Sequence, residues 1–158
     1  LGALDQIDGA GRSEVVREMP EILNYMHPVF AQLMLKDPFL SAPPQSIEPL
    51  VNTTVGISIL NELTRSVTAS PASVDERIEV GFDSANAMAQ RYGVSRGNVA
   101  KLLKKIEIAN NFGKTEKGSW ISGRLVHDYH RWQACKFAHV SIAYVEACKQ
   151  HAKASKRA

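Results

Sequence analysis

The stretch MAQRYGVSRGNVAKLLKK, residues 88–105, constrains the fold more than any other part of the chain. Residues that favour helix run up to Gly93, and a second helical pattern starts directly after Ser95. Glycine adopts positive φ without steric cost, so Gly93 can end one helix in a tight turn. Ser95 can cap the next helix by accepting hydrogen bonds from backbone N–H groups. The pattern predicts helices over about 84–91 and 96–107.

Two helices that cross steeply after a short turn need a small residue at their contact and apolar residues on the inner face. Ala89 lies four positions before the glycine and meets the first requirement. The apolar positions that follow the glycine meet the second, and they are Val94, Val99, Leu102 and Leu103. The segment is therefore predicted to be a helix–turn–helix.

The outward positions of the second helix are polar or basic, and they are Arg96, Gly97, Asn98, Lys101, Lys104 and Lys105. Arg96 can donate two hydrogen bonds to guanine, Asn98 can bond bidentately to adenine, and Gly97 leaves room for close approach. The lysines are interpreted as phosphate contacts or as solvated charge. The alternative is a plain pair of packed helices with lysines in water.

Charge is unevenly distributed along the chain, although the net charge is only +3. Residues 86–124 hold eight Lys and Arg against two acidic residues, whereas residues 1–85 hold five against twelve. A basic block of this kind is typical of a segment with a polyanionic partner. The alternative is a solvated basic face balanced by an acidic N-terminal part.

DSANAMAQRYGVSRGNVAKLLKKIE, residues 83–107, resembles the winged helix–turn–helix of bacterial transcription regulators of the GntR type. Ser84 matches the cap serine of that family, Met88 and Ala89 match its Leu-Ala, and GVSR matches at 93–96. KGSWI, residues 117–121, is similar to the strand that returns from the wing. The resemblance implies that Ser84 and Ser95 belong to the DNA-binding motif.

The resemblance also implies that Lys114 and Lys117, at the wing, reach backbone phosphate or the minor groove. The sequence departs from the family pattern at Asn86, where the family has arginine, and at Glu116, an acid in the wing. Asn110 or Asn111 can hold the left-handed residue that ends the second helix.

The layout is more similar to regulators of the MarR type, in which helices before and after the DNA module interlock into a dimer. About 80 residues precede the motif and 37 follow the wing, which ends at residue 121. The segment from Ser122 reads as one long helix, and over 137–145 it is apolar nearly all round. Such a helix must be buried on more than one side, and a second copy of the chain is the expected cover.

The other elements are predicted from periodicity and from turn residues. Residues 1–14 read as a flexible lead-in, and Ser13–Lys36 as two or three short helices with Pro20 and Pro28 in first turns. A loop is predicted at 37–46, then a helix capped by Ser46 that runs to Val67. Residues 77–82 are ambiguous between strand and helix end, and 110–122 reads as a β-hairpin.

The predicted fold is mainly α, with a winged helix–turn–helix, a small β-hairpin wing and flanking dimerisation helices. The predicted divisions are an N-terminal helical region at 1–73, the DNA-binding domain at 74–121, and one or more dimerisation helices at 122–158. No apolar run reaches the ~18 residues of a membrane span, so no membrane contact is expected.

The richest set of potential metal ligands lies in one predicted helix, at His127, Asp128, His130, Cys135 and His139. A structural zinc site needs about four ligands, which one straight helix cannot supply, although a partner subunit could complete the set. We therefore expect no metal and no cofactor, with these histidines at a dimer seam or near DNA. Cys135 and Cys148 are expected to be reduced thiols in a cytoplasmic protein.

No phosphate-binding loop, Gly-x-Ser-x-Gly elbow or His-Glu-x-x-His is present, so an enzyme is not expected. The apolar segments 22–34 and 50–63 could enclose a small-molecule effector or form a plain core. The sequence predicts a dimeric regulator that binds double-stranded DNA at a roughly palindromic operator. The alternative function is a winged-helix protein-interaction module without DNA binding.

Overall fold

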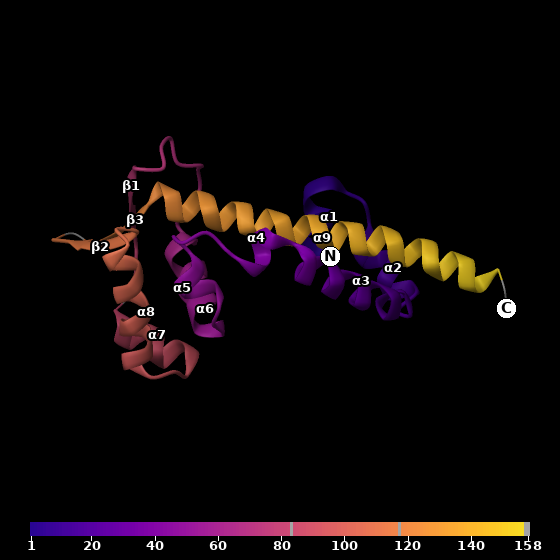
Figure 1. Ribbon diagram of the computed structural model, residues 1–158, viewed down its shortest axis with the longest axis horizontal. Coiled ribbons are helices and arrows are strands. Elements are labelled where there is room, and N and C mark those ends of the chain that lie inside the picture. The colour runs from indigo at the N-terminus through magenta and orange to yellow at the C-terminus, as the bar shows by residue number, and fades with distance from the viewer. Residues whose placement is uncertain (83, 117, 157–158) are drawn as a thin grey trace. The chain divides into compact units, whose positions relative to one another are not determined.

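The computed structural model describes residues 1–82, 84–116 and 118–156 (Figure 1). The described chain is mainly helical, with one small antiparallel sheet. Its contacts divide it into two compact units, unit 1 with Leu1–Ser41 and Trp132–Ala158, and unit 2 with Ala42–Arg131. The predicted divisions at residues 73 and 121 both fall inside unit 2.

Unit 1 is a set of helices around a small apolar core. Ile22 and Met26 pack against Ala143 and Ala147, which lie one helical turn apart on the same face of their helix. The helices of this unit are α1 (Gly2–Asp8), α2 (Arg12–Glu18), α3 (Ile22–Lys36), α4 (Pro38–Ser41) and the C-terminal part of α9 (Gly123–Ser155).

Two predictions for this region are wrong. Pro28 lies inside α3 and not in a first turn; both Pro28 and Asn24, whose carbonyl loses its partner, are exposed, so water can solvate that carbonyl. The predicted loop at 37–46 contains the short helix α4, whose start is held by Asp37, since its Oδ1 accepts from the backbone N–H of Phe39 at 2.8 Å.

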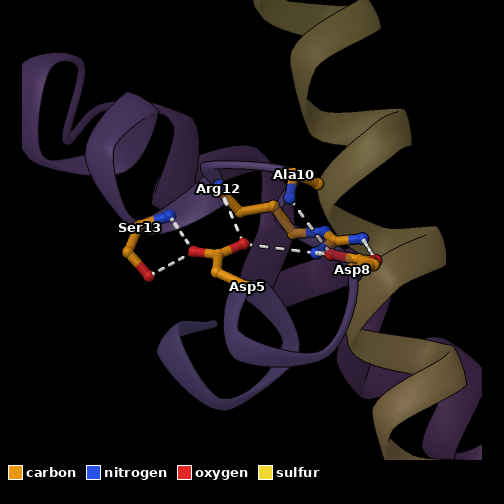
Figure 2. Close-up of polar contacts among 5 residues, drawn as sticks. All are labelled: Asp5, Asp8, Ala10, Arg12 and Ser13. Carbon is orange, nitrogen blue, oxygen red and sulfur yellow. Dashed lines mark hydrogen bonds and ion pairs between the residues drawn. The ribbon is translucent and has the colours of Figure 1, made fainter.

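The predicted flexible lead-in is also wrong, because α1 and α2 lie in this part of the chain. Figure 2 shows the polar contacts that join them. Asp5 accepts from the hydroxyl of Ser13 at 2.6 Å and from the guanidinium of Arg12 at 3.2 Å. Arg12 also donates to both carboxylate oxygens of Asp8, at 2.8 and 2.6 Å. The Ser13 hydroxyl, followed by the backbone N–H groups of Ser13 and Arg12, holds the pKa of Asp5 far below its ordinary value.

This depressed pKa predicts how the stability of unit 1 depends on pH. A carboxylate with a lowered native pKa contributes stability above its unfolded pKa of about 3.9, and the contribution is lost as pH falls toward the native pKa. We expect Asp5→Asn to lower the thermal midpoint by a constant amount above pH ~5 and by progressively less below pH ~4. Thermal unfolding by circular dichroism measures this, with Glu14→Gln, an exposed acid of α2, as the control. An Asp5→Asn effect that is the same at every pH would contradict the assignment.

Unit 2 packs helices against the three-stranded sheet. The strand order is β1-β3-β2, with both pairings antiparallel and with Ile121 opposite Ile78 on one side and Phe112 on the other. The elements are α5 (Glu48–Val51), α6 (Thr54–Thr64), β1 (Arg77–Val80), α7 (Ala85–Tyr92), α8 (Arg96–Ile108), β2 (Phe112–Thr115), β3 (Gly118–Ser122) and the start of α9. The predicted hairpin is confirmed, and the ambiguous segment at 77–82 contains a strand.

The predicted continuous helix from Ser46 to Val67 is wrong, because the chain breaks between α5 and α6. Thr53 caps the new helix by accepting from the N–H of Gly56 at 2.9 Å. The buried Ser46 donates to Asp128 Oδ2 at 2.5 Å, and it does not serve as a cap, because the N-cap of α5 is Ile47 and makes no side-chain cap hydrogen bond. Apolar residues keep helical spacing through the break because both short helices bury a face, with Leu50 and Ile59 fully inside.

α9 is a single helix of 33 residues, as predicted from Ser122 onward (Figure 1). The hydroxyl of Ser122 accepts from the N–H of Leu125 at 3.1 Å and caps it. No helix in the described part of the chain combines the length and the apolar character that a membrane span requires.

Candidate nucleic-acid interface

The predicted pair of helices and the turn between them are confirmed as α7 and α8. Ser84 caps α7 by accepting from the N–H of Ala87 at 3.1 Å, and Ser95 caps α8 by accepting from Asn98 N–H at 3.2 Å. Gly93 has φ 63° and ψ 34°, the left-handed conformation that glycine adopts without strain. The geometry of the turn therefore follows from local residue chemistry.

The inner face of α8 is buried as predicted, and α8 contacts α5, α6 and α7. Ala89 of α7 is buried at the helix contact. The buried side chains of α8 are Val99, Leu102, Leu103 and Ile106. These contacts fix which face of α8 is directed away from the core of unit 2.

The opposite face of α8 is exposed to solvent. Its exposed residues include every predicted DNA-contacting position on this helix, namely Arg96, Gly97, Asn98, Lys101, Lys104 and Lys105. No heavy atom lies within 4 Å of a Cβ built on Gly97. Packing within the described residues therefore does not require glycine at this position.

The three lysines of α8 differ in their surroundings. Lys104 Nζ lies 2.9 Å from Glu107 Oε2 on the same helix, in an exposed ion pair. Lys101 and Lys105 have no acidic partner among the described residues. The free positive charge of α8 is therefore concentrated on Arg96, Lys101 and Lys105.

The hairpin that follows α8 exposes Lys114 on β2 and Glu116 after it, while Lys117 lies outside the described residues. Trp120 on β3 packs directly over Gly113, where a Cβ would lie 2.5 Å from the indole. The guanidinium carbon of Arg77 lies 4.3 Å from the centroid of the Trp120 ring, within cation–π range. Arg77, the first residue of β1, is an exposed cation on the sheet that the local sequence pattern does not indicate.

A buried acid anchors the end of α7. Glu62 on α6 is 6% exposed, and its Oε1 accepts from Arg91 Nη1 at 2.7 Å and lies 3.3 Å from Arg65 Nη2. Tyr92 Oη also donates to Glu62, at 3.4 Å. In the sequence, the only indication that Glu62 anchors another helix is that this acid lies next to Leu63 on an otherwise apolar helix face. The contact fixes α7, and with it the start of α8, to α6.

The end of α8 is fixed by two asparagines. Asn110 has φ 54° and is the predicted left-handed residue. Asn111 is buried, donates its N–H to Ile106 O at 2.8 Å, and accepts from the Ser122 hydroxyl at 2.7 Å. This hydrogen bond joins the end of α8 to the last residue of the hairpin.

The candidate ligands on α9 do not form one set. His127 and His130 are exposed, and His127 Nδ1 lies 3.4 Å from Asp128 Oδ1. Cys135 and His139 instead meet Asp37, in unit 1. The thiol of Cys135, the Phe39 N–H and His139 together lower the pKa of Asp37.

The apolar segments predicted to enclose an effector form cores in both units. Ile22 and Met26 are buried in unit 1, and Leu50, Ile59 and Leu60 are buried in unit 2. A cavity of about 450 Å³ in unit 2 has a mixed polar and apolar lining: Pro44, Gln45, Ser46, Ala109, Asn111, Arg124 and Asp128. An effector therefore stays a prediction without an assigned site.

Comparison of the chain with protein-family models, with curated proteins and with solved structures finds no match. A functional interpretation must therefore come from the geometry of α7, α8 and the hairpin.

Proposed function

We propose that unit 2 contains a winged helix–turn–helix and that the protein is a sequence-specific, DNA-binding transcriptional regulator. The observation that carries the proposal is the exposed first turn of α8, where Arg96, Gly97 and Asn98 are directed away from the core. The order of elements supports it, because α7 and α8 are followed by a hairpin whose second strand pairs with β1. Such a regulator acts where the DNA is, which in a bacterium is the cytoplasm.

Each exposed residue has a role in the proposal. Arg96 and Asn98 read base edges in the major groove, because the N-terminal residues of a recognition helix meet the bases. Lys101 and Lys105 contact phosphates, as does Lys114 from the hairpin, and Lys104 contributes less because Glu107 partly neutralises it. Ser84 and Ser95 position the helices as caps, since backbone N–H groups occupy their hydroxyl oxygens.

We extend the proposal to a homodimer through α9. Within unit 1 one face of α9 packs into the core through Ala143 and Ala147. Another part of its surface leaves Phe137, Ile142 and Val145 exposed by 40%, 51% and 50%. A second copy of the chain would cover these side chains and supply a second α8, which suits half-sites about one helical turn apart.

The variant Gly97→Ala distinguishes a requirement for glycine in folding from a requirement for glycine in DNA binding. An alanine has free space here and favours helix, so we expect the free energy of unfolding to stay equal or to rise by up to about 1 kcal/mol. We expect DNA affinity to fall at the same time, because the methyl group keeps the backbone away from the groove. Chemical denaturation and fluorescence anisotropy on a labelled duplex measure the two quantities. A variant that is more stable and binds DNA unchanged would contradict the close approach of α8.

The salt dependence of binding tests the function. We expect the affinity for any duplex to fall steeply with salt, because each phosphate contact releases counterions. Lys105→Ala should weaken binding to all sequences alike and reduce the slope of log K against log salt by about one. Lys36→Ala, an exposed lysine of α3, is the charge-matched control and should leave the slope unchanged. Anisotropy titrations from low to moderate salt give these slopes.

The alternative function, a protein-interaction module without DNA binding, is favoured by one observation. Glu116 is exposed where the hairpin turns, and an acid there repels phosphate. A module of that kind would ignore duplex DNA even at low salt. Absence of binding by the wild-type protein at low salt would therefore favour the alternative over the regulator.

A further inference from the structure

Three different ligand-type side chains converge in unit 1, and none of them is among the residues proposed to contact DNA. Asp37 Oδ2 lies 2.8 Å from His139 Nε2 and 3.1 Å from Cys135 Sγ. Cys135 Sγ lies 3.9 Å from His139 Nε2. The three donor atoms thus form a small triangle, with Cys135 and His139 one turn apart on α9 and Asp37 at the end of α3.

The arrangement is not that of an activated thiol nucleophile. Such a site places histidine between thiol and carboxylate, with one ring nitrogen directed to each. Here Nε2 of His139 faces both other groups, and Nδ1 is buried without a hydrogen-bond partner among the described residues. The three donor atoms therefore lie close to one another without a histidine placed between thiol and carboxylate.

The size of the triangle fits a metal ion. Tetrahedral ligands at ~2.0–2.3 Å from zinc lie roughly 3.3–3.8 Å from one another. The distances of 2.8, 3.1 and 3.9 Å need shifts of a few tenths of an ångström to more than half an ångström to meet this geometry. Asp37 is prepared for the role because its other oxygen, Oδ1, is held by the Phe39 N–H.

We propose that Asp37, Cys135 and His139 bind one zinc ion, with a fourth position open to water or to a further ligand. Thiolate and imidazole select a borderline ion such as Zn²⁺ over Mg²⁺ or Ca²⁺, which prefer oxygen alone. The side chains of His139 and Asp37 are 13% and 19% exposed, so an ion and a water can enter. The sequence prediction of no metal considered only ligands on one helix, because Asp37 is about a hundred residues distant along the chain.

Zinc titration and cobalt substitution test the proposal on the full chain, kept reduced. We expect one Zn²⁺ per chain by calorimetry, and a Co²⁺ complex with a sulfur-to-metal charge-transfer band. Cys135→Ser should abolish that band, and both Cys135→Ser and His139→Gln should weaken zinc binding about 100-fold. Cys148→Ser, which removes the other cysteine of the chain, is the matched control and should change neither quantity.

A wild-type protein without the sulfur band, or a band that persists in Cys135→Ser, would overturn the proposal. If a variant fails to fold, alkylation of the wild-type protein decides the matter. Zinc should then protect Cys135 but not Cys148, as measured by mass spectrometry of the peptides, and equal alkylation with and without zinc would overturn the site. The outcome is independent of the proposed DNA binding, because all three ligands lie in unit 1.

Discussion

Gly56→Ala is expected to destabilise unit 2 by about 3 kcal/mol or more, because the added atom would overlap backbone. A Cβ at Gly56 would lie 2.0 Å from the carbonyl oxygen of Leu50 and 2.6 Å from its Cα. Backbone cannot rotate away as a side chain can, so α5 and α6 would have to separate. Separation would uncover Ile59 and Leu60, which are fully buried.

Urea denaturation followed by circular dichroism measures the effect on the free energy of unfolding. Gly81→Ala is the matched control in the same unit, since no atom lies within 4 Å of a Cβ there, and we expect its effect to stay within about 1 kcal/mol. DNA binding should be lost along with the fold, because α6 carries Glu62 and contacts α8. A Gly56→Ala protein as stable as the wild type would show that the contact between α5 and α6 is wrong.

Arg96→Ala is expected to lower the affinity for the preferred duplex about 10–100-fold, equivalent to ~1–3 kcal/mol. Arg96 is the first residue of α8 and is exposed, so its guanidinium can donate twice to one guanine. Binding to unrelated duplexes should change much less, because phosphate contacts dominate there. The ratio of the affinity for the preferred duplex to the affinity for unrelated duplexes should therefore fall sharply.

Anisotropy titrations with a preferred and a scrambled duplex measure that ratio. Arg124→Ala, an exposed arginine at the start of α9, is the control of equal charge and should affect both duplexes alike. If Arg96→Ala preserves discrimination between the duplexes, Arg96 does not read bases and the reading positions on α8 are wrongly assigned.

The parts of the fold that could be predicted are those decided by neighbours in the chain. Gly93, Ser84 and Ser95 act within three residues of their own positions, so the bounds of α7 and the start of α8 follow from residue type. Asn110 and the hairpin at 112–122 follow in the same way. The exposed face of α8 can be predicted too, because it consists of the positions that are not part of the apolar pattern.

The features that could not be predicted depend on residues far apart in the sequence. The break after α5 brings Gly56 against the backbone of Leu50, and hydrophobic periodicity does not indicate such a contact. Glu62 is placed by Arg91, 29 residues later. Pro28 is tolerated inside α3 because its neighbouring carbonyl remains open to water. The cluster of Asp37 with α9 likewise requires knowledge of the tertiary fold.

Selection of bound duplexes from a random pool, at two salt concentrations, tests the central claim most directly. The wild-type protein should enrich one motif with two inverted half-sites about one helical turn apart, as two copies of α8 require. The motif should persist at the higher salt while unspecific binding disappears. A pool that shows no enriched sequence at either concentration would contradict DNA reading by α8.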